Sequence, residues 1–381
     1  MRVRFDRGRQ EQVPGQIQLG RTRPGRGARG RDGGNGAGDL SGAVTAWMRH
    51  RAGLVATEVV ERATAAVRGT LAHGATAIRS HVDVGDDLGL RALEALVEVR
   101  RTVRDECDLQ LVAFVSVPLT GVAGASHRAL LRAAVEAGAD VVGGVPTLDP
   151  DPAAAIDTCF EVAGDHARPV DLHIDETLDP SVLTLATLAD AVLGSGFAQP
   201  VAASHCVSLG ALPVEQAAAI AGRVAKAGIA VICLPQTNLY LQGRDRPVDT
   251  PRGLTAVHTL RAAGVVVAAG GDNVQDPFNC VGRGDPLETA ALLVLAGHDS
   301  PAGAYAATSD QARRALGLPA VEVAPGFPAD LLAIRAGSIR EAVGTAHPDR
   351  VVIHRGRVVA RTTVSRAFPV QAARRSPERL S

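Results

Sequence analysis

Lysine is nearly absent from this sequence. Lys226 is the only one, so arginine supplies almost all of the basic charge. A Schiff-base aldolase needs a lysine side chain inside its pocket, whereas Lys226 falls within a helical pattern of apolar residues. This absence excludes the aldolase class of barrel enzyme.

Closely spaced cysteines and long apolar runs are also missing. The five cysteines are far apart, their number is odd, and no CxxC occurs, so neither a disulfide framework nor a zinc knuckle is indicated. No run of about 18 apolar residues and no signal-peptide pattern is present. We therefore expect a cytoplasmic protein with no membrane partner.

An excess of charge of either sign is lacking as well. Forty basic residues balance forty acidic ones, which gives no field that would attract nucleic acid or an anionic membrane. The basic start of the chain holds a single aromatic residue, Phe5, too few for base stacking. We expect a small, roughly neutral molecule as the partner, and a homo-oligomer remains open.

Residues 1–38 differ in composition from the rest of the chain. About half of them are glycine or arginine, and their few apolar residues form no helical or strand face. Such a segment cannot offset the entropy lost on ordering. We therefore expect residues 1–38 to be disordered.

The remainder alternates short β-rich runs with amphipathic helical patterns. Buried apolar strands separated by helices predict a parallel sheet covered on both faces. We expect an incomplete barrel over 39–318, a small β domain over 319–365 and a flexible tail over 366–381. The small β domain is predicted to be an appendage of the barrel, a fragment of a β-sandwich, that turns at Arg355-Gly356. The predicted barrel strands are 76–84, 108–117, 140–145, 170–176, 200–208, 228–238 and 265–272. The clearest helical patterns are 57–72, 88–104, 127–137, 180–193, 213–226 and 253–263.

Polar residues near the carboxyl ends of these strands favour a barrel over a doubly wound sheet. In a (β/α) barrel those ends meet at one mouth, and no GxGxxG follows any predicted strand to suggest a dinucleotide fold. We therefore predict an α/β fold, a (β/α) TIM-type barrel. Only seven of its eight strands can be found. The strand-end polar residues are His81, Asp83, His173, Glu176, His205, Asn238 and Asp272.

The motif VDLHIDE carries the sharpest chemical signal. His173 and Glu176 close one strand and could place an imidazole beside a carboxylate. Imidazole binds zinc or iron, and a nearby carboxylate can move protons to and from water. A structural histidine explains this motif alone equally well. His205 ends the motif ASH, and Asp272 follows AGG. Together with His173 and Glu176, these two residues are a stronger indication of a metal site.

These stretches resemble the cytosine deaminase-like branch of the amidohydrolase superfamily. The resemblance covers most of residues 40–362. Its motifs are SHVDV (80–84), AGADVVGGVP (137–146), DLHIDE (171–176), ASH (203–205), NLYLQGR (238–244), PRGLTAV (251–257) and GDNVQDPF (271–278).

The resemblance implies a hydrolase that acts on the C–N bond of a cyclic amidine or other N-heterocycle with one divalent ion, Fe²⁺ or Zn²⁺. It implies that His173 and Asp272 bind the metal and that Glu176 moves the proton. His205 and Asp272 would join Glu176 in catalysis. The residues implied to line the substrate pocket are His81, Ser116, Gln242, Asn273, Asp276 and Phe278.

Two features depart from the family pattern. The family takes two further metal ligands from a His-x-His pair on its first barrel strand, but no two histidines here are separated by one residue. We expect weak metal binding and little activity, and a wrong reading frame or start within residues 1–38 would explain the loss. An impaired or inactive homologue, or a binding scaffold, is the alternative.

The second departure concerns the substrate. Ser116 stands where the cytosine-specific enzymes carry a glutamine. A short hydroxyl cannot form the same paired hydrogen bonds to a pyrimidine edge. Cytosine is therefore disfavoured relative to other N-heterocycles. A Cys206–His205 dyad is disfavoured too, because neighbours on a strand point to opposite faces.

Overall fold

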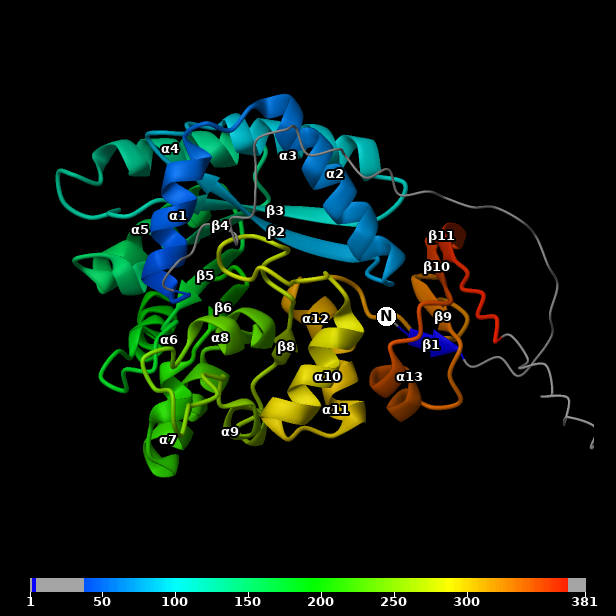
Figure 1. Ribbon diagram of the computed structural model, residues 1–381. Helices are drawn as coiled ribbons and strands as arrows, with labels where there is room; N and C mark the ends of the chain where they lie inside the picture. Colours follow the sequence, from blue (N-terminus) through cyan, green and yellow to red (C-terminus); the bar gives the residue numbers. More distant parts are fainter. Residues whose placement is uncertain (1, 5–37, 369–381) are drawn as a thin grey trace, which may run out of the picture.

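The computed structural model describes residues 2–4 and 38–368 and contains two separate sheets (Figure 1). The larger sheet is wholly parallel, with strands in chain order, and forms an incomplete TIM-type barrel. Its strands are β2 (Ala77–Val84), β3 (Asp108–Val115), β4 (Val141–Gly144), β5 (Val170–Ile174), β6 (Val201–His205), β7 (Ala230–Cys233) and β8 (Val267–Ala269). The fold predicted from the sequence is confirmed.

The two ends of this sheet are open. Among the described residues, β2 and β8 pair on one side only and are not hydrogen bonded to each other. Most of β2 is only partly buried, whereas every residue of β6 is buried. The seven strands therefore leave the cylinder unclosed between β2 and β8, as the count from the sequence predicted.

Helices cover the outer face of the barrel sheet. Several begin with an aspartate that accepts a backbone N–H of the first turn, as Asp39, Asp151 and Asp285 do, the last two followed by proline. The helices are α1 (Leu40–Arg51), α2 (Ala56–Ala72), α3 (Arg91–Val103), α4 (Ala125–Glu136), α5 (Pro152–Asp165), α6 (Thr184–Ser195), α7 (Val214–Lys226), α8 (Pro235–Leu241), α9 (Val257–Ala262), α10 (Pro286–Gly297), α11 (Pro301–Ala307), α12 (Asp310–Ala315) and α13 (Ile339–Thr345). No helix in the described ranges is both long and apolar enough to span a bilayer.

The smaller sheet combines both ends of the described chain. Strands β9 (Leu331–Ile334), β10 (Arg350–His354) and β11 (Arg357–Thr362) are antiparallel, as predicted for the appendage. Strand β1 (Arg2–Arg4) pairs parallel to β9. The expectation that residues 1–38 hold no strand is wrong for residues 2–4, because the β9 edge supplies backbone partners that composition does not reveal. The rest of that segment, 5–37, and the end of the tail, 369–381, lie outside the described residues.

The predicted strand over 228–238 is too long. Strand β7 ends at Cys233, and α8 begins at Pro235, whose fixed φ suits the first helical turn. Asn238 therefore lies on a short helix, not at a strand end. Similarly, β8 ends at Ala269, so Asp272 lies in the loop that follows.

A buried arginine joins the small sheet to the barrel helices. Arg350 of β10 donates both terminal nitrogens to Asp285, at 2.9 and 2.7 Å, and Asp285 also caps α10. It donates further to the backbone oxygens of His73, Ala346 and His347. The Arg350 side chain is 1% exposed, so the pair is shielded from water.

We expect Arg350→Met to lower the free energy of unfolding by about 3–5 kcal/mol, because it leaves the Asp285 carboxylate buried without its partner. Urea unfolding measures the change. Arg335→Met is the matched control. Arg335 and its partner Asp349 lie at the ends of β9 and β10 in the same small sheet, but the Arg335 side chain is 73% exposed. The control should cost less than about 1 kcal/mol. Equal losses in the two variants would contradict this role for Arg350.

Candidate metal centre

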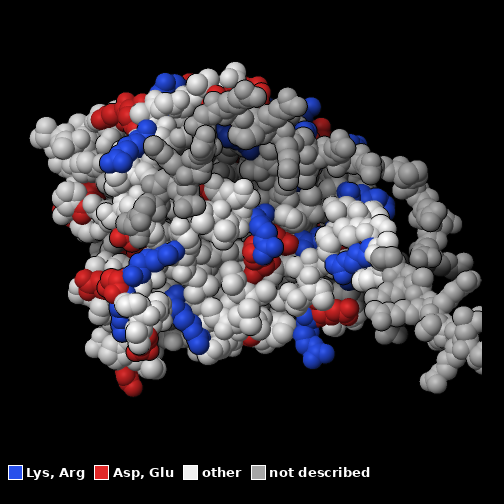
Figure 2. Space-filling model, in the orientation of Figure 1, with Lys and Arg blue, Asp and Glu red and all other residues white. Residues whose placement is uncertain are grey.

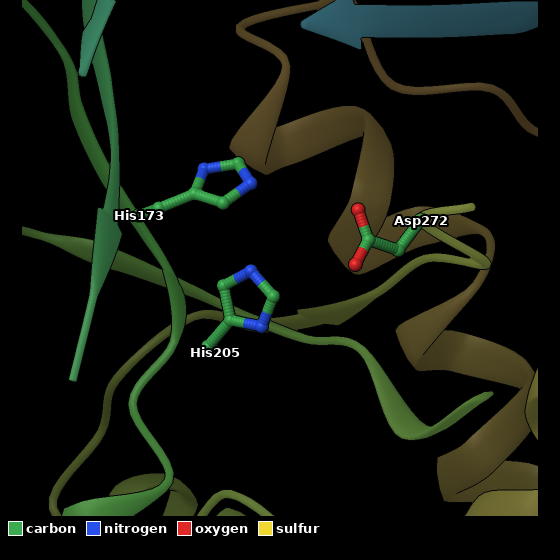
Figure 3. Close-up of side chains that lie close together, drawn as sticks. All are labelled: His173, His205 and Asp272. Atoms are coloured by element: carbon green, nitrogen blue, oxygen red, sulfur yellow. The ribbon is translucent and has the colours of Figure 1, made fainter. Parts of the chain in front are cut away.

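Two histidines from neighbouring strands face the same space inside the barrel (Figure 3). His173 of β5 lies opposite Ser204 of β6, and the ring centroids of His173 and His205 are 4.7 Å apart. Strand alternation alone would send Ser204 and His205 to opposite faces. His205 instead has φ +69°, in the left-handed region, and this turns its ring inward beside Ser204, whose hydroxyl bonds to Asp171 inside the barrel.

Asp272 completes a three-residue group with these histidines. One ligand atom from each of His173, His205 and Asp272 lies within 4.8 Å of the others. Asp272 also has a positive φ, 59°, and its carboxylate points across the space toward both rings (Figure 3). The loss of water around this carboxyl raises its pKa to about 6, and a hydrogen bond from Thr237 opposes the rise.

Glu176 follows β5 and reaches the same space. Its Oε1 lies 3.4 Å from Nδ1 of His205. Burial, together with the negative charge of Asp272, raises the pKa of Glu176 well above its usual value. A raised pKa suits a carboxyl group that accepts a proton and later returns it. Gln242, directly after α8, donates to the backbone oxygen of Glu176 at 3.1 Å. This bond links the end of α8 to Glu176.

Several buried polar atoms in this group have no hydrogen-bond partner among the described residues. They are Nδ1 of His173, Nε2 of His205 and Oε1 of Glu176. Burial lowers the pKa of His173 well below its usual value and that of His205 to about 3, so both rings are neutral. Neutral imidazoles and a carboxylate with unused lone pairs are what a divalent zinc or iron ion binds. The residues fit such an ion.

A charged layer supports this group from inside the barrel. Asp171 accepts a hydrogen bond from Arg79 at 2.8 Å, and Nε2 of His81 lies 3.6 Å from its other oxygen. Burial alone would raise the pKa of Asp171, but His81 and Arg79 outweigh it and hold that pKa well below its usual value. His81 in turn packs edge-on against His173, with ring centroids 4.6 Å apart. His81 therefore lies beside His173, and its contact with substrate remains a prediction.

Ser116 lies in a bonded network at the end of β3. Its hydroxyl accepts from Arg51 at 2.9 Å, and Arg51 also pairs with Asp83 and Asp87. Trp47 donates to Asp83 at 2.9 Å. The pKa of Asp83 is raised, because burial outweighs the neighbouring positive charge of Arg51. Sequence reasoning missed Arg51 and Trp47, because α1 showed only helical periodicity.

The loop after Asp272 is organised by its own side chains. Asn273 accepts from Thr237 at 3.0 Å and donates to Asp276 at 2.7 Å. The other oxygen of Asp276 accepts the backbone N–H groups of Phe278 and Asn279. Asn273, Asp276 and Phe278 are thus brought together in one turn, and their contact with substrate remains a prediction.

Cys206 does not form a nucleophile with His205. Its thiol is buried and lies against backbone oxygens of β6, and burial raises its pKa well above the usual value. A protonated, enclosed thiol is unreactive. Cys206 therefore fills core space.

A second group with metal-ligand atoms lies at the other end of the sheet. Asp108 begins β3, and it lies near Asp330 and the buried His354 of β10. Arg355 pairs with Asp108 at 2.5 Å, and Arg313 pairs with Asp330 at 3.3 Å. Two guanidinium groups already balance the two carboxylates, so this group joins the small sheet to the barrel and suits a cation poorly.

The chain belongs to the amidohydrolase family, whose sequence model matches residues 18–360. It is 37% identical over 332 residues to a pterin deaminase of Rhizobium rhizogenes, covering 85% of this chain and 75% of that protein. It superimposes with a TM-score of 0.80 on a 5-methylcytosine deaminase from Klebsiella pneumoniae at 30% identity, covering 87% and 82% of the two chains. An N-isopropylammelide isopropylaminohydrolase from Burkholderia multivorans gives a TM-score of 0.68 at 32% identity, covering 78% and 74%. The resemblance seen in the sequence is confirmed, and the chain is an amidohydrolase-type enzyme by homology.

Charges on the surface alternate in sign. On the face shown in Figure 2, the described basic and acidic side chains lie in small, separate groups. Among the described residues, Arg283 pairs with Glu288 and Arg132 pairs with Glu161. This distribution suits a small substrate better than a polyanion.

Proposed function

We propose that this chain has the active-site framework of a deaminase that hydrolyses the exocyclic C–N bond of an N-heterocycle. The observation that supports this most is the convergence of four side chains from three separate segments on one space: His173 and Glu176 from β5 and the loop after it, His205 from β6, and Asp272 from the loop after β8. The family match and the relatives named as pterin and 5-methylcytosine deaminases support the same reaction class.

His173 and Asp272 are the proposed ligands of one divalent ion, zinc or iron. When bound, the ion polarises the substrate and lowers the pKa of a water molecule. Glu176 is placed to receive, as a carboxylate, the proton that the attacking water loses and then to deliver that proton to the departing amine, and its raised pKa favours holding the proton between the two steps. The products are then ammonia and the ring carbonyl. His205 would steady the tetrahedral species by hydrogen bonding.

The substrate is proposed to be a ring other than cytosine, such as a pterin, a methylated pyrimidine or a triazine. Ser116 is already engaged by Arg51, so its hydroxyl offers little to a pyrimidine edge. The mouth also carries His81, Gln242, Asn273, Asp276 and Phe278 as the proposed substrate contacts. Their amide, carboxyl and aromatic groups suit a flat, polar heterocycle.

A catalytically impaired homologue is the second candidate, and one observation favours it. The sequence contains no His-x-His pair, and the described barrel is open between β2 and β8. The two proposed ligands, His173 and Asp272, are fewer than the three that a catalytic zinc site usually takes from the protein, so they hold an ion poorly. We therefore expect little turnover from the chain as it stands.

Ammonia release from a panel of N-heterocycles tests the proposal. The panel includes a pterin, 5-methylcytosine, cytosine and an aminotriazine, each offered with zinc and with iron. A second protein, termed the restored protein, replaces residues 5–37 with a segment of an amidohydrolase-family member that carries the His-x-His strand. We expect ammonia from the restored protein with a ring other than cytosine and almost none from the chain itself. Failure of a folded, metal-loaded restored protein on every ring would contradict the proposed reaction class.

A further inference from the structure

Asn238 makes a polar contact with His205 that the proposed reaction does not yet explain. The Asn238 side chain is completely buried on α8, and its amide nitrogen Nδ2 lies 3.0 Å from Nδ1 of His205. This residue comes from the segment after β7, whereas His205 ends β6. The contact therefore joins two neighbouring units of the barrel at its mouth.

We infer that Asn238 is a positioning residue that holds His205 in the neutral tautomer with its proton on Nε2. An amide nitrogen can only donate, so Nδ1 of His205 must offer its lone pair. A neutral imidazole carries one proton, which then resides on Nε2. Nε2 is the nitrogen that is buried and without a partner among the described residues, and it faces the space shared with His173 and Asp272 (Figure 3).

Hydrogen bonds on both sides of His205 hold its backbone in place. Thr255 donates its hydroxyl to the His205 carbonyl, and the N–H of Cys206 bonds to Ile174 of β5 at 2.8 Å. Asn238 is fixed too, because its backbone N–H bonds to Leu234 at 3.1 Å at the start of α8. Both partners are thus held on rigid elements rather than on free loops.

Glu176, whenever it is ionised, has the opposite influence on the same ring nitrogen. Its Oε1 lies 3.4 Å from the same Nδ1. An ionised carboxylate at that position would draw the histidine proton to Nδ1 and leave a lone pair on Nε2. The amide of Asn238, which is closer, opposes this change and preserves an N–H donor pointing into the site.

This tautomer also decides the role of His205 in the reaction, a step that rests on the proposed function. With a proton on Nε2, His205 acts as a hydrogen-bond donor to the oxygen that gains charge on the reacting carbon, and it does not bind the ion. The metal ligands supplied by the described residues are then His173 and Asp272. The three-residue group becomes two ligands and one donor.

Nitrogen NMR of labelled histidine tests the tautomer without any metal or turnover. Long-range proton–nitrogen correlation spectra distinguish a protonated ring nitrogen from a bare one, and His205→Gln identifies the His205 signals. We expect a bare Nδ1 and a protonated Nε2 in the unmodified chain. In Asn238→Asp, which replaces the amide donor by a carboxylate oxygen, we expect the proton on Nδ1.

Asn273→Asp is the matched control, because Asn273 bonds to Thr237 and Asp276 and not to His205. It should leave the His205 pattern unchanged. Circular dichroism verifies that each variant is folded, and Asn238→Ala replaces Asn238→Asp if the latter is not. A proton on Nδ1 in the unmodified chain, or a folded Asn238→Asp with an unchanged His205 pattern, would overturn the inference.

The catalytic consequence is tested separately in the restored protein. We expect Asn238→Asp to lower kcat about 100-fold with little change in KM, as loss of one donor to a developing oxyanion does. An altered tautomer with unchanged kcat would overturn the role of His205 as donor. If the restored protein releases no ammonia at all, the proposed function fails, and the nitrogen spectra still decide the tautomer.

Discussion

Glu176→Gln in the restored protein is expected to lower kcat by about 10²–10⁴-fold, the usual contribution of a general acid–base group. Glutamine keeps the shape of the side chain, but it cannot accept and return a proton. Burial and the charge of Asp272 raise the pKa of Glu176, which favours its holding the transferred proton until the amine departs. Steady-state ammonia release measures the change.

Metal content provides the control for this variant. Glu176 is not a proposed ligand, so Glu176→Gln should bind zinc as tightly as the parent protein. Glu176→Asp, which retains the carboxyl but withdraws it by one carbon, should keep more activity than the glutamine variant. A glutamine variant with kcat within a few-fold of the parent would remove Glu176 from the reaction.

Restoring the His-x-His strand is expected to raise zinc affinity by at least about 1,000-fold. His173 and Asp272 supply two ligands, whereas a catalytic zinc site takes three or more from the protein. The added strand is also expected to pair between β2 and β8, so the ligands are held in place before the ion binds. The unmodified chain should bind zinc weakly and show little turnover.

The barrel could be predicted from the sequence because its strands are continuous apolar runs. Strand β5 shows how candidate site residues could be predicted as well. Its apolar pattern ends at His173 and Glu176, and the carboxyl ends of the parallel strands meet at one mouth of the barrel. Asp272 was found by the same reasoning, although it lies in a loop three residues beyond β8. Strand ends can be estimated from pattern, while their exact limits depend on local backbone geometry.

The contacts that orient the site could not be predicted in this way. His205 faces the site only through its positive φ, which no period-two pattern reveals. Asn238 reaches His205 from a helix that begins at a proline immediately after a short strand. Arg79 and Asp171 form a buried pair 92 residues apart in the chain, at positions where an apolar strand pattern leads one to expect core residues.

We propose that His173 and Asp272 hold one divalent ion at the barrel mouth. A competitive chelator titration with zinc on the restored protein tests it most directly, using His173→Ala, Asp272→Asn and, as a control from the second group, His354→Gln. The claim predicts one equivalent of zinc, lost or weakened at least 100-fold in the first two variants and unchanged in the control. Zinc binding that survives both His173→Ala and Asp272→Asn, or that depends on His354, would contradict it.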